Sequence, residues 1–166
     1  MDAKLDLEGP HWRFALDFYG RPGVQEACLR LQDEHGFDII ALVAILHAAI
    51  VSGRGMDEEE IAALRRDMAL WREKTVLTLR RLRRELKSPP PEFPAAETES
   101  LRDLIKKAEL KAEQIQLALA AQWLQARTPR RTLPVEAALT RLAEGPIDPG
   151  NEDLATVIAA ARAAAG

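Results

Sequence analysis

The chain has 166 residues, of which 47% are hydrophobic and 30% are charged, and its net charge is −3. This length suits one domain with a buried core, and this charge gives no reason to expect nucleic acid or an anionic membrane as a partner. The single cysteine, Cys28, excludes an internal disulfide and a cysteine-based zinc site. The first ten residues are acidic and show no signal peptide, so we expect a cytoplasmic protein.

Three short helices are predicted in residues 10–55. Pro10 suits the first turn of a helix, which Gly20 ends. An apolar stripe at helical spacing follows over residues 24–35, and Gly36 is the expected C-cap. Because helix formers such as Ala, Leu, Arg and Glu are abundant along the whole chain, the sequence predicts an all-α fold.

The stretch 37–51 contains only two polar residues, Asp38 and His47, and its apolar residues face every direction of a helix. A helix of this kind lies in a protein core or in a membrane. Its roughly 15 residues are fewer than the about 20 needed to cross a bilayer. We therefore predict a core helix at the centre of the N-terminal unit, with Asp38 as its N-cap.

Residues 56–127 predict a long antiparallel helical hairpin. Its first helix begins with a capping box, formed by Asp57 and Glu60, and runs for about 30 residues. A Pro-rich joint at residues 88–96 cannot be helical, and a second helix follows over residues 97–127. Two helices of matched length across such a joint pack antiparallel, over roughly 45 Å at 1.5 Å per residue.

Each long helix carries a predicted apolar seam. The seam of the first helix consists of Ile61, Leu64, Met68, Trp71, Thr75, Leu79, Leu82 and Leu86. The seam of the second consists of Leu101, Leu104, Ala108, Ile115, Leu119, Gln122 and Ala126. The basic run 80–87 is interpreted as a solvated helix end, which the helix dipole favours. Three short helices cannot cover both sides of this hairpin, so we expect an exposed apolar strip unless the C-terminal residues cover it.

The predicted architecture is a single all-α domain over residues 1–166. A compact three-helix N-terminal unit packs on the long hairpin, and short helices in residues 128–166 complete the fold. These C-terminal helices are expected near residues 135–143 and 152–165, on either side of a loop rich in Pro and Gly.

The chain contains no phosphate-binding, dinucleotide-binding, zinc-protease or serine-hydrolase motif. Glu8 and His11 have the spacing of a di-iron ligand pair, but the pair is single and straddles Gly-Pro, so we reject it. Cys28 and His35 lie two helical turns apart, about 10 Å, which is too far for a nucleophile and its base. We therefore expect no metal and no cofactor, and binding is favoured over catalysis.

A candidate pocket or polar cluster is formed by Trp12, Gln32, Asp33, His35, Asp38, His47, Trp71 and Arg72. His47 lies inside the apolar helix, where an imidazole needs a partner or stays neutral. It is either a satisfied core histidine or a polar group in an apolar pocket between the central helix and the hairpin. An acid–base site of Asp33, His35 and Asp38 requires that these three side chains converge on one cleft.

Three blocks within residues 11–119 carry a resemblance to a known family. The blocks contain Trp12, Phe14, Tyr19, Pro22-Gly23-Val24, Ala27-Cys28-Leu29, Leu31-Gln32-Asp33, Gly36 and Asp38, then Trp71-Arg72 with residues 79–87, and then residues 108–113. Together they resemble an uncharacterised proteobacterial family, domain-of-unknown-function family 2390. Leu70 departs from the family pattern, which has proline before Trp-Arg. The resemblance implies a shared fold and no particular activity.

We expect a non-catalytic interaction module that acts through the long hairpin, as a homo-oligomer or as an adaptor for another protein. The alternative is a helical bundle that binds a small molecule or lipid in a pocket near Trp12, His47 and Trp71. Neither hypothesis involves nucleic acid or a membrane as the partner.

Overall fold

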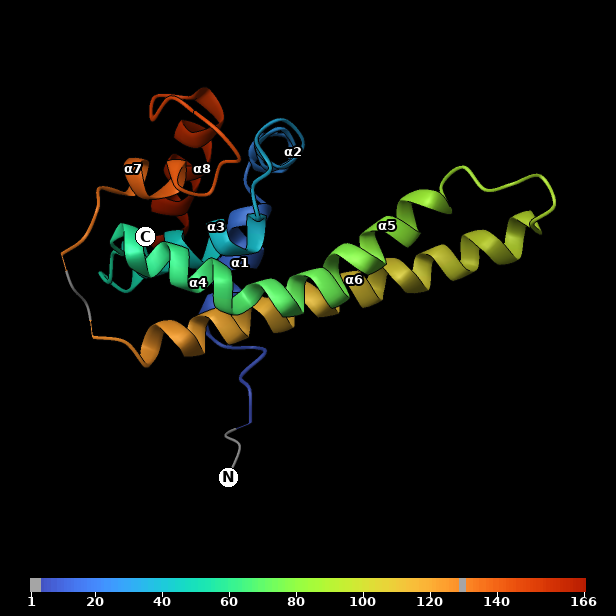
Figure 1. Ribbon diagram of the computed structural model, residues 1–166, viewed down its shortest axis with the longest axis horizontal. Coiled ribbons are helices and arrows are strands. Elements are labelled where there is room, and N and C mark those ends of the chain that lie inside the picture. Colours follow the sequence, from blue (N-terminus) through green and yellow to red (C-terminus); the bar gives the residue numbers. More distant parts are fainter. Residues whose placement is uncertain (1–3, 129–130) are drawn as a thin grey trace.

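The computed structural model describes residues 4–128 and 131–166, and its fold is all-α, which confirms the prediction (Figure 1). The elements in chain order are α1 (Pro10–Tyr19), α2 (Val24–His35), α3 (Ile39–Leu46), the π-helical segment η1 (His47–Val51), α4 (Glu58–Trp71), the π-helical segment η2 (Arg72–Val76), α5 (Leu77–Glu85), α6 (Ala95–Gln125), α7 (Val135–Thr140) and α8 (Glu152–Ala165). Within the described residues, none of these helices is both long enough and apolar enough to cross a membrane.

Helix α3 forms the centre of a globular body. Its residues from Ile40 to Leu46 are each at most 6% exposed. Around it, α1, α2, α4, α7, α8 and the second half of α6 contribute to one hydrophobic core. Asp38 caps α3, because its Oδ1 accepts hydrogen bonds from the backbone N–H groups of Ile40 at 3.0 Å and Ala41 at 3.3 Å. The predicted core helix and its cap are both confirmed.

Two other predicted helix ends are present in the structure. Gly36 follows α2 in the left-handed conformation, with φ of 67°, and its N–H donates to the last turn of the helix. At the start of α4, Glu60 N donates to Asp57 Oδ1 at 2.8 Å and Asp57 N donates to Glu60 Oε2 at 3.1 Å. This reciprocal pair is the predicted capping box.

The first long helix of the hairpin is interrupted by η2. A π-helical turn closes i→i+5 hydrogen bonds and holds one extra residue, so it rotates the residues that follow relative to those that precede. The predicted seam is correct from Ile61 to Met68, which are buried, but wrong at Leu82, which is 42% exposed. Leu86, also a predicted seam position, is buried, and so is Val76, which the predicted seam omits. A heptad pattern assumes an uninterrupted α-helix, and η2 breaks that assumption.

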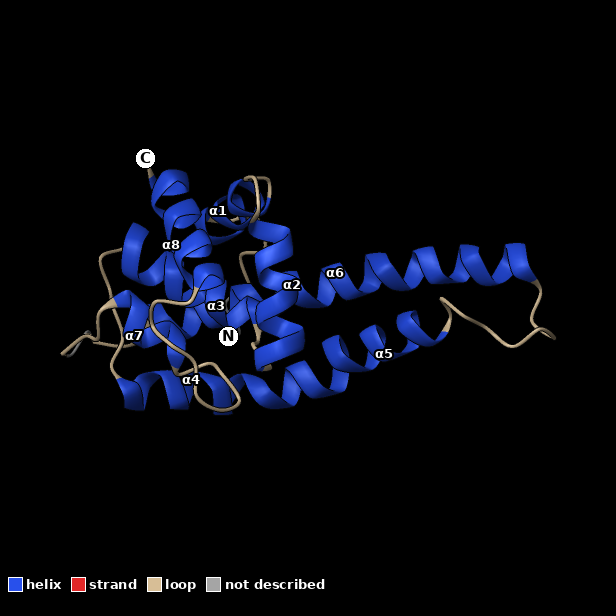
Figure 2. Ribbon diagram, turned by 90° about the horizontal axis from the view of Figure 1, so that it is seen from above, coloured by secondary structure: helices blue, strands red, loops and turns tan. Residues whose placement is uncertain are grey.

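An arm projects from the body (Figures 1 and 2). It consists of residues 77–111, which comprise α5, the Pro-rich connector and the first half of α6 packed antiparallel on α5. The predicted α6 seam is wrong here, since Leu101 and Leu104 are 50% and 61% exposed. The buried positions are instead Thr98, Ile105 and Glu109. The arginines of α5 bind Glu109, and these ion pairs set which face of α6 points inward.

The C-terminal helices pack on the body. Helix α8 lies against α1 and α2, and α7 lies against α3 and α8. The arm is therefore not covered by them, as Figure 1 shows. At the other end of the chain, Gln114 of α6 donates to the backbone carbonyl of Leu7 at 2.9 Å and to Glu8 at 3.2 Å, so the segment before α1 is held against α6.

Candidate functional site

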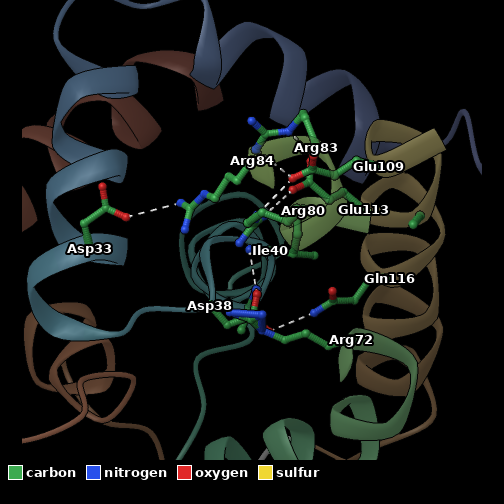
Figure 3. A network of polar contacts seen from close by, with 12 residues as sticks. Asp33, Asp38, Ile40, Arg72, Arg80, Arg83, Arg84, Glu109, Glu113 and Gln116 are labelled. Carbon is green, nitrogen blue, oxygen red and sulfur yellow. Dashed lines mark hydrogen bonds and ion pairs between the residues drawn. The ribbon is translucent and has the colours of Figure 1, made fainter. Parts of the chain in front are cut away.

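The carboxylate of Asp38 joins the N-terminal unit to the hairpin (Figure 3). Arg72, the first residue of η2, places its Nε 3.0 Å from Asp38 Oδ2, and Gln116 of α6 donates to the same oxygen at 2.8 Å. The side chains of Asp38 and Arg72 are only 16% and 18% exposed, so this ion pair is weakly screened by solvent. Three elements that are distant in the sequence therefore meet at one carboxylate.

A second ion cluster lies at the root of the arm (Figure 3). Arg80 donates to Glu109 at 2.9 Å and to Glu113 at 2.8 Å, and Arg83 donates to both carboxylate oxygens of Glu109. The side chains of Arg80 and Glu109 are 13% and 9% exposed. The interpretation of the basic run 80–87 as a solvated helix end is wrong for these two arginines, because the facing helix supplies their carboxylate partners.

The two carboxylates of this cluster have opposite pKa shifts. Burial opposes ionisation of Glu109, but hydrogen bonds from Arg83 and Arg80 outweigh burial and lower its pKa. Burial raises the pKa of Glu113; Arg80 opposes this rise and the charge of Glu109 adds to it. Glu109 is thus the charged anchor of the cluster, and Glu113 is the carboxylate that takes up a proton more readily.

A cleft of about 300 Å³ lies beside the ion cluster, between α2 and the root of the arm. Its lining residues are Tyr19, Gln25, Cys28, Leu29, Gln32, Ile39, Arg80, Arg83, Glu109 and Glu113. Burial, with a smaller effect of Asp153, raises the pKa of the Cys28 thiol to about 12. Burial also raises the pKa of Tyr19 well above 10. Both groups are protonated at neutral pH, so the cleft presents hydrogen-bonding groups rather than a thiolate nucleophile.

The structure does not bring the three predicted acid–base residues together. Asp33 is exposed and lies 3.6 Å from Arg84 of α5. His35 ends α2, where its backbone carbonyl accepts a hydrogen bond from Glu144 N at 2.8 Å. Asp38 is committed to its cap and to the ion pair described above. Because Asp33 and Asp38 bind arginines of different elements, Arg84 of α5 and Arg72 of η2, an acid–base site of these three residues is not supported.

The other predicted site residues are divided among different places. Gln32 lines the cleft beside the ion cluster. Trp71 donates from Nε1 to the backbone carbonyl of Ala112 at 3.0 Å, which ties α4 to α6. Trp12 is partly buried against the core. His47 lies at the start of η1, with its ring 5.3 Å from the ring of Phe14, and lines a second pocket between η1 and α6.

Sequence reasoning missed the ion cluster of Arg80, Arg83, Glu109 and Glu113. A signal was present, because Arg80 and Arg83 are three residues apart on one helix of the hairpin, and Glu109 and Glu113 are four apart on the other. Such spacings place each pair on one helix face. Opposite charges on two facing helices of a hairpin indicate a pairing across it.

In the ranges that the structure describes, no group of three or more His, Cys, Asp and Glu side chains is placed to hold a metal ion. The fold and the site together define an all-α protein in which a small helical unit is fastened by ion pairs to a projecting hairpin. The family model described as protein of unknown function (DUF2390) matches residues 10–120, and the chain belongs to this family. The matched range contains every residue that lines the cleft. Searches of the curated proteins and of the solved structures gave no match.

Proposed function

We propose that this chain is a non-catalytic, cytoplasmic interaction module that pairs with a second copy of itself through the arm. The observation that supports this most is the row of exposed leucines on the arm, where Leu82 is 42%, Leu101 50% and Leu104 61% exposed. The C-terminal helices pack on the body and leave these side chains uncovered. Exposed apolar strips of this kind are typical of protein-binding surfaces.

The leucines on α6 form a stripe. Leu101, Leu104 and Ala108 recur three and four residues apart, so they lie on one side of the helix. All three are exposed. An antiparallel hairpin with such a stripe is half of a four-helix bundle, and a second hairpin completes it.

The charges on the arm favour a second copy as the partner. Exposed basic residues lie on α5, at Arg81 and Arg84, whereas the first turns of α6 carry exposed Glu97, Glu99 and Asp103. Arg84, Glu99 and Asp103 also form exposed pairs within the chain, which a partner would have to rearrange. A two-fold arrangement that lays α5 of one copy along α6 of the other brings these opposite charges together. Complementary charge increases the association rate and disfavours wrong partners.

The size of the arm limits the area of this interface. Sixteen residues of α6, 95–110, extend about 24 Å at 1.5 Å per residue, and two helices side by side are about 20 Å wide. One face of the arm therefore measures about 500 Å², below the roughly 800 Å² per partner of a standard interface. We expect reversible association with a Kd in the micromolar range.

Sedimentation velocity on the full chain, from about 5 to 500 µM, tests this proposal. The wild type is expected to shift from monomer to dimer across this range. The double variant Leu101→Gln, Leu104→Gln is expected to stay monomeric. Leu16→Gln is the matched control, because Leu16 is 56% exposed but lies on α1 in the body. A wild type that remains monomeric throughout, or a dimer unaffected by the double variant, would refute self-pairing through the arm.

A cross-linking experiment locates the interface. Ser100→Cys places a thiol on the exposed side of α6 in the arm, and Ala159→Cys places one on the exposed side of α8. The native Cys28 is buried and does not compete. A short bis-maleimide is expected to give covalent dimer with Ser100→Cys and not with Ala159→Cys. The reverse pattern would assign the interface to the body.

A further inference from the structure

A pocket of about 190 Å³ lies between the start of α1, η1 and the end of α6. Its walls are largely apolar and include Val51, Ala121 and Leu124. Two histidines, His11 of α1 and His47 of η1, also line it. The pocket lies outside the arm and apart from the ion cluster, so what it binds is a separate question from self-association.

Both imidazoles carry a buried nitrogen without a hydrogen-bond partner. These atoms are Nε2 of His11 and Nε2 of His47. His11 is only 6% exposed as a residue. A buried polar atom left unpaired costs about 1–3 kcal/mol, which is why most such atoms in folded proteins have a partner. Both residues line the pocket, so a polar group of a ligand that reaches these nitrogens would pair them.

The two rings are neutral at physiological pH. Burial lowers the pKa of His11, against the raising effects of the Asp6 carboxylate and a hydrogen bond involving the Asp6 backbone. Burial lowers the pKa of His47 as well, and His11 lowers it further. A ring nitrogen of His11 donates to a backbone carbonyl in that bond, and Nε2 is the nitrogen without a partner. In the neutral ring, Nε2 of His11 is therefore an acceptor.

The chemistry of the two nitrogens selects the ligand group. His11 needs a donor, and His47 supplies an N–H or a lone pair, depending on its tautomer. A hydroxyl that donates its single proton to His11 and accepts from the Nε2–H tautomer of His47 satisfies both rings. Arg54 also lines the pocket and would pair with a carboxylate, but a carboxylate only accepts and leaves the lone pair of His11 unpaired. A metal ion needs further ligands, and the described residues contain no group of three suitable side chains.

The dimensions of the pocket select the rest of the ligand. A dry cavity of about 150 Å³ is large enough for benzene. A pocket of about 190 Å³ therefore accepts one aromatic ring or a short branched alkyl group. The position of His47 fits a binding role, because it begins a π-helical segment whose i→i+5 bond runs from Ser52 N to His47 O at 3.1 Å. Such segments occur frequently at functional sites.

We propose that this pocket binds a small apolar molecule with one hydroxyl group, such as a phenol, with the hydroxyl between His11 and His47 and the ring against Val51, Ala121 and Leu124. The pocket is then a ligand site inside the body, and the arm is left free for its partner.

Phenol and toluene are the matched probes, because they have nearly the same shape and differ in the hydroxyl. Binding to the full chain is followed by chemical shifts of backbone amides, and long-range ¹H–¹⁵N spectra follow the imidazole nitrogens. The wild type is expected to bind phenol at least about tenfold more tightly than toluene, the effect of one hydrogen bond. Phenol is also expected to shift the Nε2 resonances of His11 and His47, and toluene is not.

His47→Leu keeps a similar side-chain volume. In this variant the affinity for phenol is expected to fall to the affinity for toluene. The affinity for toluene is expected to stay within twofold of its wild-type value. His35→Gln is the control, since His35 does not line this pocket. Equal binding of the two probes, no shift of the imidazole nitrogens, or phenol binding that survives His47→Leu would overturn the proposal. Zn²⁺ binding that depends on both histidines would also overturn it, in favour of a metal site. If His47→Leu does not fold, the wild-type spectra with phenol and toluene still decide.

Discussion

Arg72 Nε lies 3.0 Å from Asp38 Oδ2, while the other oxygen of the same carboxylate caps helix α3. One side chain thus begins the core helix and fastens the hairpin to it. The N-terminal unit and the hairpin are coupled at the residue where the core helix starts, so a change at Asp38 affects both.

Asp38→Asn is expected to lower the free energy of unfolding by about 2–3 kcal/mol. Asparagine keeps the cap, so the loss comes from leaving the partly buried Arg72 without its counter-charge. The control is Asp33→Asn, because Asp33 and Arg84 are 58% and 55% exposed and 3.6 Å apart. That variant is expected to lose at most about 0.5 kcal/mol. Urea unfolding measures the loss of unfolding free energy in both variants, provided that the m-value is unchanged. Equal losses would show that the Asp38–Arg72 pair is no stronger than a surface pair.

Glu109→Gln is expected to loosen the arm and leave the body intact. The change removes the charge that Arg80 and Arg83 share, and these arginines are only 13% and 24% exposed. Because Arg83 then lacks a charged partner and Arg80 keeps only Glu113, local opening of residues 77–111 is expected to become easier by about 2–4 kcal/mol.

Native-state hydrogen exchange measures this effect residue by residue. Faster exchange confined to the arm is the expected result for Glu109→Gln. Asp103→Asn is the control, since Asp103 forms an exposed i,i+3 pair with Lys106. Exchange that accelerates equally in α3 would show that the arm and the body unfold as one unit.

The sequence predicts the body better than the arm, for physical reasons. The core helix can be predicted because Asp38 precedes a run whose apolar residues face every direction of a helix. The glycine cap at Gly36 can be predicted too, because it depends only on neighbouring residues. The inward face of α6 is not visible in this way, because Leu101 and Leu104 look like seam positions. Their exposure follows from arginines of α5 that bind Glu109 of α6 across 26 to 29 residues of sequence.

The candidate site could be predicted only in part. Asp38, Arg72 and Gln32 are in the predicted cluster. Gln116, which donates to Asp38, and Arg80 and Glu109, which line the cleft with Gln32, are not. Which hairpin residues face α2 depends on the rotation introduced by η2, and a local sequence pattern does not reveal a π-helical turn. The His11–His47 pocket depends on the packing of α1 against the π-helical segment η1. It could not be predicted either, because the sequence pattern does not reveal that segment.

Cys28 is expected to be inert in the folded protein. Its thiol is 5% exposed, and burial raises its pKa to about 12, so the thiolate fraction at pH 8 is very small. Reaction with a disulfide reagent such as 5,5′-dithiobis(2-nitrobenzoate) at pH 8 is expected only on unfolding, at the rate at which the native state opens. The Ser100→Cys variant provides an exposed thiol as the control. Immediate reaction of one thiol in the native wild type would contradict the burial of Cys28.

Glu113 is expected to make the protein less stable as the pH rises above the ordinary glutamate value of 4.5. Its folded-state pKa is raised, chiefly by burial, so the folded state holds the proton more tightly than the unfolded state. The resulting stabilisation is complete below the unfolded-state pKa and is lost as the pH rises through the folded-state pKa. Glu109 has the opposite sign, since its pKa is lowered, and its contribution is lost as the pH falls.

Glu113→Gln isolates the effect of Glu113, because glutamine does not titrate. The difference in unfolding free energy between wild type and Glu113→Gln is expected to move against the wild type between pH 4 and pH 7. A difference that is constant over this range would show that the pKa of Glu113 is not raised, and one that moves in favour of the wild type would show that Arg80 outweighs burial.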